Sequence, residues 1–268
     1  IIDNIPGGKV GVPVQRRRLH ASQYGCVCPV ETPEGQKVGL NKGLALISHI
    51  TFGTPTRYII QFLIDEGLEV LDDLTPVEAQ RVSKVFVNGN WIGCHRNPTQ
   101  LQRVFTLYRR NGLINVFISF AWDRSTNEIQ IFTDGGRFVR PLYTIQDNNL
   151  LLQPRHIRNI KAGELTFTDL VSGFRKRQEQ YDYYSQDVRP LTTLGLDKND
   201  ALCLAKLAET QAVIEYIDCQ EFDTTMLPIG FSIDHTSLQR FTHMELHPSM
   251  FLSFNAHLLP FCEHNLAP

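Results

Sequence analysis

Hydrophobic and polar residues alternate along the middle of the chain with a period of two, which is typical of half-buried β-strands. Residues 84–87 and 90–93 flank an Asn-Gly pair. Because Asn-Gly accepts the positive φ angles of a tight turn, this pattern predicts a β-hairpin. Residues 116–120 and 128–132, with a polar turn between them, predict a second hairpin.

A helical period follows the first hairpin. Asn97 and Pro98 provide a cap and a first helical residue, and Gly112 suits the end of the helix. Arg109 and Arg110 fall in the last turn, where the helix dipole favours cations, and we prefer this structural role to nucleic-acid binding. The apolar residues that recur on one face are Leu101, Val104, Phe105 and Tyr108.

Other segments predict further elements, so the sequence indicates an α+β fold. Residues 75–78 read Thr-Pro-Val-Glu, a capping box that begins a helix, and residues 201–212 are rich in helix formers. Residues 58–64 fit a strand or a short helix. The remaining predictions are strands at 138–142 and 213–217, a buried apolar run at 44–52, and an exposed amphipathic helix within 161–200.

The composition is that of a globular protein with enough residues to bury a core. Of 268 residues, 42% are hydrophobic and 20% are charged. The sequence contains no apolar run of about 18 residues, so it predicts no membrane span. It begins with Ile1 and shows no signal sequence, so we expect an internal piece of a longer polypeptide that is not secreted.

Charge is unevenly distributed, although the net charge is only −2. Residues 1–43 carry six basic side chains against three acidic ones. Such an excess suits a nucleic-acid backbone, because Lys and Arg displace its condensed counterions. A solvated basic loop is the alternative interpretation. The basic residues are Lys9, Arg16, Arg17, Arg18, Lys37 and Lys42.

The cysteine and histidine spacings do not indicate a zinc site. Cys26 and Cys28 form C-x-C, and no second pair stands at zinc-finger spacing. Unpaired thiols fit a reducing compartment. His243 and His247 are four residues apart, a spacing that binds zinc on a helix, but Met244 stands where a zincin has Glu. A metal hydrolase is therefore a minor alternative.

The most distinctive segment is residues 29–40. Pro29 and Pro33 fix φ and lack an N–H donor, while Gly35 and Gly39 permit positive φ, so the segment predicts a rigid turn-rich loop. CPVETPEG followed by GL, preceded by PGGKV and RRRLH, resembles the fork region of the second-largest (beta-type) subunit of multisubunit DNA-directed RNA polymerases.

The resemblance spans nearly the whole chain and is closer to the eukaryotic, archaeal and large-DNA-virus type than to the bacterial type. Residues 143–213 match least well. Further matching motifs are VNGNW at 87–91, RRNG at 109–112, DGGR at 134–137, RPL at 140–142, EYID at 215–218 and HPSM at 247–250. The resemblance implies a multi-lobed fragment: a discontinuous fork domain (1–52 and 198–252), an α/β external 2 lobe inserted at 53–197, and the start of a hybrid-binding domain at 253–268.

The resemblance also implies a function. The chain would form part of the fork loop and active-centre wall, which position DNA, RNA and the incoming nucleotide during template-directed RNA synthesis. Nucleotidyl transfer needs carboxylate-bound Mg²⁺, and the chain has no D-x-D-x-D cluster. In the family the largest subunit holds most of the Mg²⁺ ligands. We therefore expect no catalytic residue here and no activity from this chain alone.

The resemblance assigns roles to individual residues. Lys9, Arg16, Arg17, Arg18, Lys37 and Lys42 would contact nucleic acid. Pro33, Glu34, Gly35, His264 and Asn265 would be active-centre scaffold, with Glu34 in a supporting role.

The implied partners are the largest subunit, other polymerase subunits, the DNA template, the RNA–DNA hybrid and nucleoside triphosphates, without a membrane. The implied location is the nucleus for a cellular eukaryotic source, or the cytoplasm, a viral factory or a virion for an archaeal or viral source. A non-catalytic nucleic-acid-binding or assembly module is the alternative function.

Overall fold

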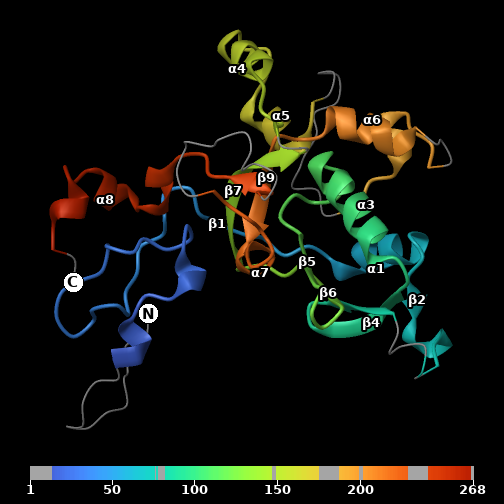
Figure 1. Ribbon diagram of the computed structural model, residues 1–268, viewed down its shortest axis with the longest axis horizontal. Helices are drawn as coiled ribbons and strands as arrows, with labels where there is room; N and C mark the ends of the chain where they lie inside the picture. Colours follow the sequence, from blue (N-terminus) through green and yellow to red (C-terminus); the bar gives the residue numbers. More distant parts are fainter. Residues whose placement is uncertain are drawn as a thin grey trace.

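Helices and two open sheets give the chain a mixed α+β fold, as the sequence predicts (Figure 1). The computed structural model describes residues 14–75, 77, 82–146, 149–174, 187–198, 202–228 and 241–266. The N-terminal segment, in blue, and the C-terminal segment, in red, lie together on the left of the view. A backbone hydrogen bond of 2.8 Å from Leu46 N to Leu252 O joins these two segments.

The first sheet has the strand order β2-β4-β3-β6-β5. Its strands are β2 (Glu69–Val70), β3 (Ser83–Val87), β4 (Asn90–His95), β5 (Ser119–Asp123) and β6 (Glu128–Phe132). Asn88 and Gly89, with φ angles of 49° and 81°, make the predicted tight turn, and β5 and β6 form the second predicted hairpin. β3 and β6 run parallel, so the chain must cross over between them.

Helices α1 (Thr56–Asp65) and α3 (Pro98–Arg110) pack against this sheet and build the main core. The apolar face predicted for α3 is buried, and the Asn97 side chain caps the helix by accepting from Gln100 N at 3.1 Å. Residues 58–64 are helical rather than extended. The most deeply buried side chains include Ile59 and Leu63 of α1, Leu101 and Phe105 of α3, and Val85, Ile129 and Ile131 of the sheet.

The second sheet is organised around β7 (Phe138–Gln146), which includes the strand predicted at 138–142. Antiparallel to β7 are β1 (His49–Ile50), β8 (Asn149–Leu150), β9 (Ile214–Asp218) and β10 (His243–Met244). Thus β7, from within residues 53–197, pairs with strands from residues 1–52 and 198–252. This sheet joins parts of the chain that are distant in sequence.

The remaining helices are short. They are α4 (Pro154–Lys161), α5 (Phe167–Ser172), α6 (Cys203–Thr210), α7 (Cys219–Phe222) and α8 (Phe254–His257), with 3-10 helices η1 (Val14–Arg17), η2 (Ala21–Gln23), η3 (Leu71–Asp73), η4 (Leu191–Leu194), η6 (Pro248–Phe251) and η7 (Cys262–His264). None of the helices in the described ranges is long and apolar enough to cross a membrane.

Two sequence predictions fall partly outside the described residues. The helix start predicted at 75–78 includes Pro76 and Glu78, which are not described. Within 161–200, the described parts hold α5 and η4, and residues 175–186 are not described.

The buried apolar run predicted at residues 44–52 is wrong. Leu44, Leu46 and Phe52 are 44%, 46% and 71% exposed, whereas Ala45 and Thr51 are buried. β1 contributes two residues to the second sheet. Because so little of this segment is in the sheet, most of its apolar side chains have no sheet face to cover.

A buried ion-pair network joins α3 to β9 and α7. The Arg109 side chain is 2% exposed and contacts both Glu215 and Glu221, with 2.6 Å from Nη2 to Glu221 Oε1. Arg109 Nη1 also donates to Ile118 O at 2.8 Å. Arg110 Nη2 lies 2.9 Å from Glu215 Oε2. The helix dipole is thus not the main partner of these arginines, because two carboxylates from distant elements contact them directly.

A second, partly buried ion pair extends the connection from β9 to the first sheet. Arg137 Nη1 lies 2.8 Å from Asp218 Oδ2, and Ser119 Oγ donates to the same oxygen at 2.6 Å. Arg137 Nη2 donates to Phe117 O at 2.8 Å. Since Ser119 is in β5 and Asp218 is in β9, this pair links the two sheets.

Burial and charge shift the pKa values of the two glutamates in opposite directions. Burial disfavours ionised Glu215, but the charges of Arg109 and Arg110 outweigh that effect and hold the pKa of Glu215 well below its usual value. Burial raises the pKa of Glu221. The negative charges of Glu215 and Asp218 add to this effect, and together they outweigh the lowering influence of Arg109. Glu215 is therefore the firmly ionised partner of Arg109.

We expect Glu215→Gln to destabilise the chain more than Glu221→Gln. Glu215→Gln removes the charge that Arg109 and Arg110 share, and breaking a buried pair costs about 3–5 kcal/mol. Glu221→Gln removes a carboxylate that burial disfavours, so its loss should be nearer to about 1–2 kcal/mol. Urea denaturation at neutral pH measures both. Equal losses, or a larger loss for Glu221→Gln, would contradict this ranking.

The depressed pKa of Glu215 also predicts acid sensitivity. Its contribution to stability is complete above the pKa of an unfolded Glu, about 4.3, and is lost as the pH falls through the lower folded-state value. The free energy of unfolding should therefore decrease with falling pH in this acid range, and less steeply in Glu215→Gln. Urea titrations from neutral to strongly acidic pH measure the slope. Identical slopes in the two proteins would refute the assignment.

Candidate functional site

Residues 29–43, which we call the Pro/Gly loop, fold into successive turns. Gly39 donates its N–H to Thr32 Oγ1 at 2.7 Å, and Leu40 N–H donates to Lys37 O at 3.1 Å. Gly35 and Gly39 have φ angles of 91° and 72°, which favour glycine. The turn-rich loop predicted from the sequence is therefore confirmed.

The Pro/Gly loop lies directly against the arginine segment 16–18. A Cβ atom on Gly39 would stand 2.3 Å from Arg17 O, so no other residue fits there without a backbone shift. The Arg17 side chain also contacts the loop, because its Nη1 donates to Val38 O at 2.8 Å. Arg17 thus braces the loop, and one of its predicted phosphate-binding donors already has a partner within the chain.

Glu31 ties the Pro/Gly loop to the C-terminal segment. Asn255 Nδ2 donates to Glu31 Oε1 at 2.7 Å. Hydrogen bonds from Ser253 and Asn255 lower the pKa of Glu31, which favours its ionised form. A Cβ on Gly43 would lie 2.3 Å from Glu31 Oε2, so Gly43 leaves room for this carboxylate.

A buried arginine supports the chain just before the Pro/Gly loop. The guanidinium carbon of Arg140, on β7, lies 5.1 Å from the ring centroid of Tyr24 and 4.7 Å from that of Phe222. Arg140 Nη1 also lies 2.7 Å from Glu245 Oε1. A Cβ on Gly25 would clash with Arg140 Nη1 at 2.3 Å. Sequence reasoning gave Arg140 no role, because its partners are distant along the chain.

Most of the predicted cationic residues are at the surface. Arg16, Arg18, Lys37 and Lys42 are exposed, and Arg17 is half-buried. The contact of Arg17 with Val38 and Gly39 brings the arginine segment close to the turn that contains Lys37. Lys9 lies outside the described residues.

The predicted scaffold residues form two separate groups. Pro33, Glu34 and Gly35 are exposed in the Pro/Gly loop. His264 and Asn265 are exposed at the end of η7, where His264 Nε2 lies 3.7 Å from Glu263 Oε1. In the described part of the chain, no hydrogen bond or ion pair joins the two groups.

His243 and His247 do not form the helical pair that zinc would require. His243 is in β10, and its Nε2 lies 3.2 Å from Glu215 Oε2, so it belongs to the buried network. His247 caps η6, accepting from Ser249 N at 3.3 Å. Among the described residues, no group of three His, Cys, Asp or Glu side chains is arranged to hold a metal ion.

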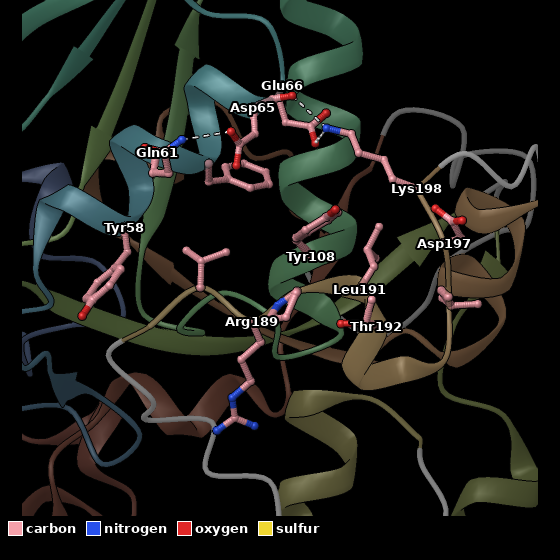
Figure 2. A pocket seen from close by; sticks show the side chains of 14 residues that line it. Tyr58, Gln61, Asp65, Glu66, Tyr108, Arg189, Leu191, Thr192, Asp197 and Lys198 are labelled. Carbon is pink, nitrogen blue, oxygen red and sulfur yellow. Dashed lines mark hydrogen bonds and ion pairs between the residues drawn. The ribbon is translucent and has the colours of Figure 1, made fainter.

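Two cavities lined by described residues lie near the elements discussed above, and neither contains an arrangement of side chains that resembles a catalytic site. A cavity of about 470 Å³ lies between α1, α3 and residues 188–198 (Figure 2). Its polar groups largely pair with each other, since Lys198 Nζ lies 2.7 Å from Glu66 Oε1 and donates to Asp65 O at 2.8 Å. A smaller cavity of about 290 Å³, lined by residues that include Leu19, Tyr24 and Phe251, adjoins the arginine segment.

Comparisons with protein families match two parts of the chain. The family described as RNA polymerase Rpb2, domain 3 matches residues 10–50, which contain the arginine segment and the Pro/Gly loop. The family described as RNA polymerase Rpb2, domain 4 matches residues 85–146, from β3 to the end of β7.

Curated relatives match the chain over almost its whole length. DNA-directed RNA polymerase II subunit RPB2 of the yeast Meyerozyma guilliermondii is 34% identical over 99% of this chain, which spans 23% of that protein. DNA-directed RNA polymerase subunit 2 of Acanthamoeba polyphaga mimivirus is 29% identical over 94% of the chain and 20% of the viral protein. DNA-directed RNA polymerase III subunit RPC2 of Drosophila melanogaster is also 29% identical, over 94% of the chain and 19% of that protein. The chain thus spans less than a quarter of these relatives.

We expect Gly39→Ala to detach the Pro/Gly loop from Arg17. The added Cβ would meet a backbone oxygen, which cannot move aside as a flexible side chain can, and overpacking of this kind costs about 1–3 kcal/mol. Amide hydrogen exchange of residues 32–40 should accelerate. Gly35→Ala is the matched control: it shares the positive φ, but no atom lies within 4 Å of its Cβ. Equal exchange in both variants would show that the contact with Arg17 does not hold the loop.

Proposed function

The chain belongs to the family of second-largest subunits of DNA-directed RNA polymerases, of which it represents a segment, and on this premise we propose that it helps to position nucleic acid during RNA synthesis. The observation that carries the proposal is the contact between the arginine segment and the Pro/Gly loop. A braced backbone there presents cationic side chains at the surface.

Electrostatics supports a contact with phosphates in this region. Arg16, Arg18, Lys37 and Lys42 are exposed, and long cationic side chains at a surface attract a phosphate backbone without reading its sequence. Lys9 would join this group. Arg17 acts differently in the proposal, because its bond to Val38 O fixes the position of its neighbours. The role of the cationic group is therefore positional.

The exposed acid Glu34 of the Pro/Gly loop would act through its neighbours. Glu34 is exposed between Pro33 and Gly35 in a turn-rich backbone. A carboxylate repels phosphate, so Glu34 is proposed to orient basic or hydroxyl groups of the active centre. His264 and Asn265 would complete the scaffold from the C-terminal segment, which Glu31 and Asn255 hold beside the Pro/Gly loop.

The chemistry itself is proposed to take place on another polypeptide. Nucleotidyl transfer uses Mg²⁺ ions held by carboxylates, which neutralise the charge on the reacting phosphates. The described residues offer no group of three carboxylate, histidine or cysteine side chains for such ions. We therefore propose that the largest subunit supplies most of the Mg²⁺ ligands, and that this segment contributes to template-directed synthesis only within the assembled enzyme.

The proposed partners and domains follow from the same assignment. The partners are the largest subunit, other polymerase subunits, template DNA, the RNA–DNA hybrid and nucleoside triphosphates. The proposed domains are a fork domain at 1–52 and 198–252, an external lobe at 53–197 and the start of a hybrid-binding domain at 253–268. The sheet around β7 would make the junction between fork and lobe continuous. The enzyme would act in the nucleus, or in the cytoplasm, a viral factory or a virion if the source is archaeal or viral.

An assembly module is the second candidate, and exposed apolar side chains favour it. Near the end of the chain Phe254, Leu258, Phe261 and Leu266 are 64%, 68%, 73% and 102% exposed. Large exposed apolar patches mark contact surfaces. In this alternative the segment would bind neighbouring subunits of the enzyme, and other parts of the enzyme would bind the nucleic acid.

The Arg16→Ala/Arg18→Ala double variant is expected to weaken binding of a DNA–RNA scaffold by the assembled enzyme. The slope of log affinity against log salt should become less steep by roughly 0.9 for each phosphate that the variant no longer neutralises. Fluorescence anisotropy at several salt concentrations measures both quantities. Arg158→Ala, which changes an exposed arginine on α4, is the matched control and should leave the slope unchanged.

The same measurement separates the two candidates. An unchanged slope in the double variant, with the enzyme still assembled, would overturn the nucleic-acid role and favour the assembly module. Tight scaffold binding by the isolated chain, without the largest subunit, would instead indicate a generic nucleic-acid-binding module.

A further inference from the structure

Two cysteines that are far apart in sequence lie in contact beside the Pro/Gly loop. Cys26 and Cys219 are 193 positions apart, and their Sγ atoms are 3.8 Å apart. A disulfide needs about 2.05 Å between these atoms, so closing it would take a movement of about 1.8 Å. We propose that Cys26 and Cys219 form a redox-modification site, at which a small disulfide such as oxidised glutathione converts the two thiols to an intramolecular disulfide.

The backbone on both sides of the pair is held in place. Gly25, with a φ of 72°, turns the chain against Arg140 immediately before Cys26. Cys26 then forms backbone hydrogen bonds with two neighbouring segments: its N–H donates to Gln23 O at 3.1 Å, and its carbonyl accepts from Ala45 N at 3.1 Å. Cys219 begins α7 directly after β9. The thiol contact therefore arises from two anchored segments.

The two thiols differ in access and reactivity, as a reactive pair requires. Cys26 is 4% exposed, whereas Cys219 is half-buried and is therefore the more accessible of the two. The hydrogen bond from Cys26 lowers the pKa of Cys219 to about 7, which outweighs burial and the negative charge of Asp218; the positive charge of Arg140 also lowers this pKa. The same contact, together with burial, raises the pKa of Cys26. Cys219 is thus the attacking group and Cys26 the resolving group.

The chemistry balances as a thiol–disulfide exchange. The Cys219 thiolate attacks one sulfur of the small disulfide, forms a mixed disulfide and releases one small thiol. The Cys26 sulfur then attacks Cys219 Sγ and expels the second small thiol, which takes up the Cys26 proton. The two protein thiols lose two electrons in total, and the small disulfide gains them. The exchange needs no metal and no oxygen.

The new bond would connect functional elements of the chain. Cys26 belongs to the segment that leads into the Pro/Gly loop, and Cys219 joins β9 to α7. Cys219 Sγ also lies 3.7 Å from Ser22 O in η2. A disulfide would fasten the approach to the Pro/Gly loop to the element that carries Glu215 and Asp218. The redox state would thereby set how firmly the loop is held.

Equilibration of the full polypeptide that contains this chain in glutathione buffers of graded oxidation tests the proposal. After acid quenching and alkylation, peptide mass spectrometry without reduction should show one cross-link between the peptides of Cys26 and Cys219. Oxidation should also slow hydrogen exchange of residues 20–28, and reduction should restore it. Cys219→Ser, which changes a half-buried side chain, should abolish both effects.

Cys28→Ser is the matched control, because Cys28 is buried in the same segment. The cross-link should persist in this variant. Its loss, or a Cys26–Cys28 cross-link in the wild-type protein, would assign the chemistry to another pair and overturn the proposal. Full alkylation of both Cys26 and Cys219 after treatment with oxidised glutathione alone would overturn it as well. Each outcome is independent of whether the chain contacts nucleic acid.

Discussion

The guanidinium of Arg109, buried between Glu215 and Glu221, is the interaction on which the arrangement of the two sheets depends. A buried charge is tolerated only when it is paired and its donors are satisfied, and here two carboxylates and the Ile118 carbonyl achieve this. The arginine comes from the end of α3 and the carboxylates from β9 and α7. Because these elements must meet for the charge to be paired, the network specifies how the second sheet lies against the first core.

The same network also helps to position the candidate site, which consists of the arginine segment and the Pro/Gly loop. β9 pairs with β7, and β7 carries Arg140, whose guanidinium lies against Tyr24 next to Gly25. From there the chain enters the Pro/Gly loop, which Arg17 and Glu31 hold through separate contacts. The surface cations thus stand on a backbone that is held by the contacts of Arg17, Glu31 and Arg140. To position nucleic acid, the cationic side chains must start from a backbone that is held in place, and several of them can then share the contacts with phosphates.

Local patterns in the sequence were sufficient for the elements whose stability is local. The turn at Asn88 and Gly89, the cap at Asn97 and the alternation over β6 each depend on neighbouring residues, so composition and spacing predict them. The turns of the Pro/Gly loop are predictable for the same reason. The motifs at 109–112, 134–137 and 215–218 carried a family resemblance, but their spacing did not show that they meet.

The remaining features depend on contacts between distant residues. Arg140 pairs with Glu245, 105 positions away, and Glu31 pairs with Asn255, 224 positions away, so no local pattern marks either partner. Leu44, Leu46 and Phe52 form an apolar run that resembles a core strand, yet they are 44%, 46% and 71% exposed because β1, the strand in this segment, has only two residues. The family resemblance implied that Arg17 contacts nucleic acid, and its bond to Val38 could be seen only in the folded chain.

The central place of β7 has a consequence for how the polypeptide acquires its fold during synthesis. Its partners β9 and β10 are made long after β7 itself, since Val139 pairs with Asp218 and Thr144 pairs with His243. Until those later strands are made, only β1 and β8 can pair with β7, at its two ends, and the unpaired backbone between them can be joined by other extended chains. We therefore expect nascent chains interrupted before residue 214 to aggregate. Rapid translation of the following segment, or binding of a chaperone to β7, would prevent this aggregation.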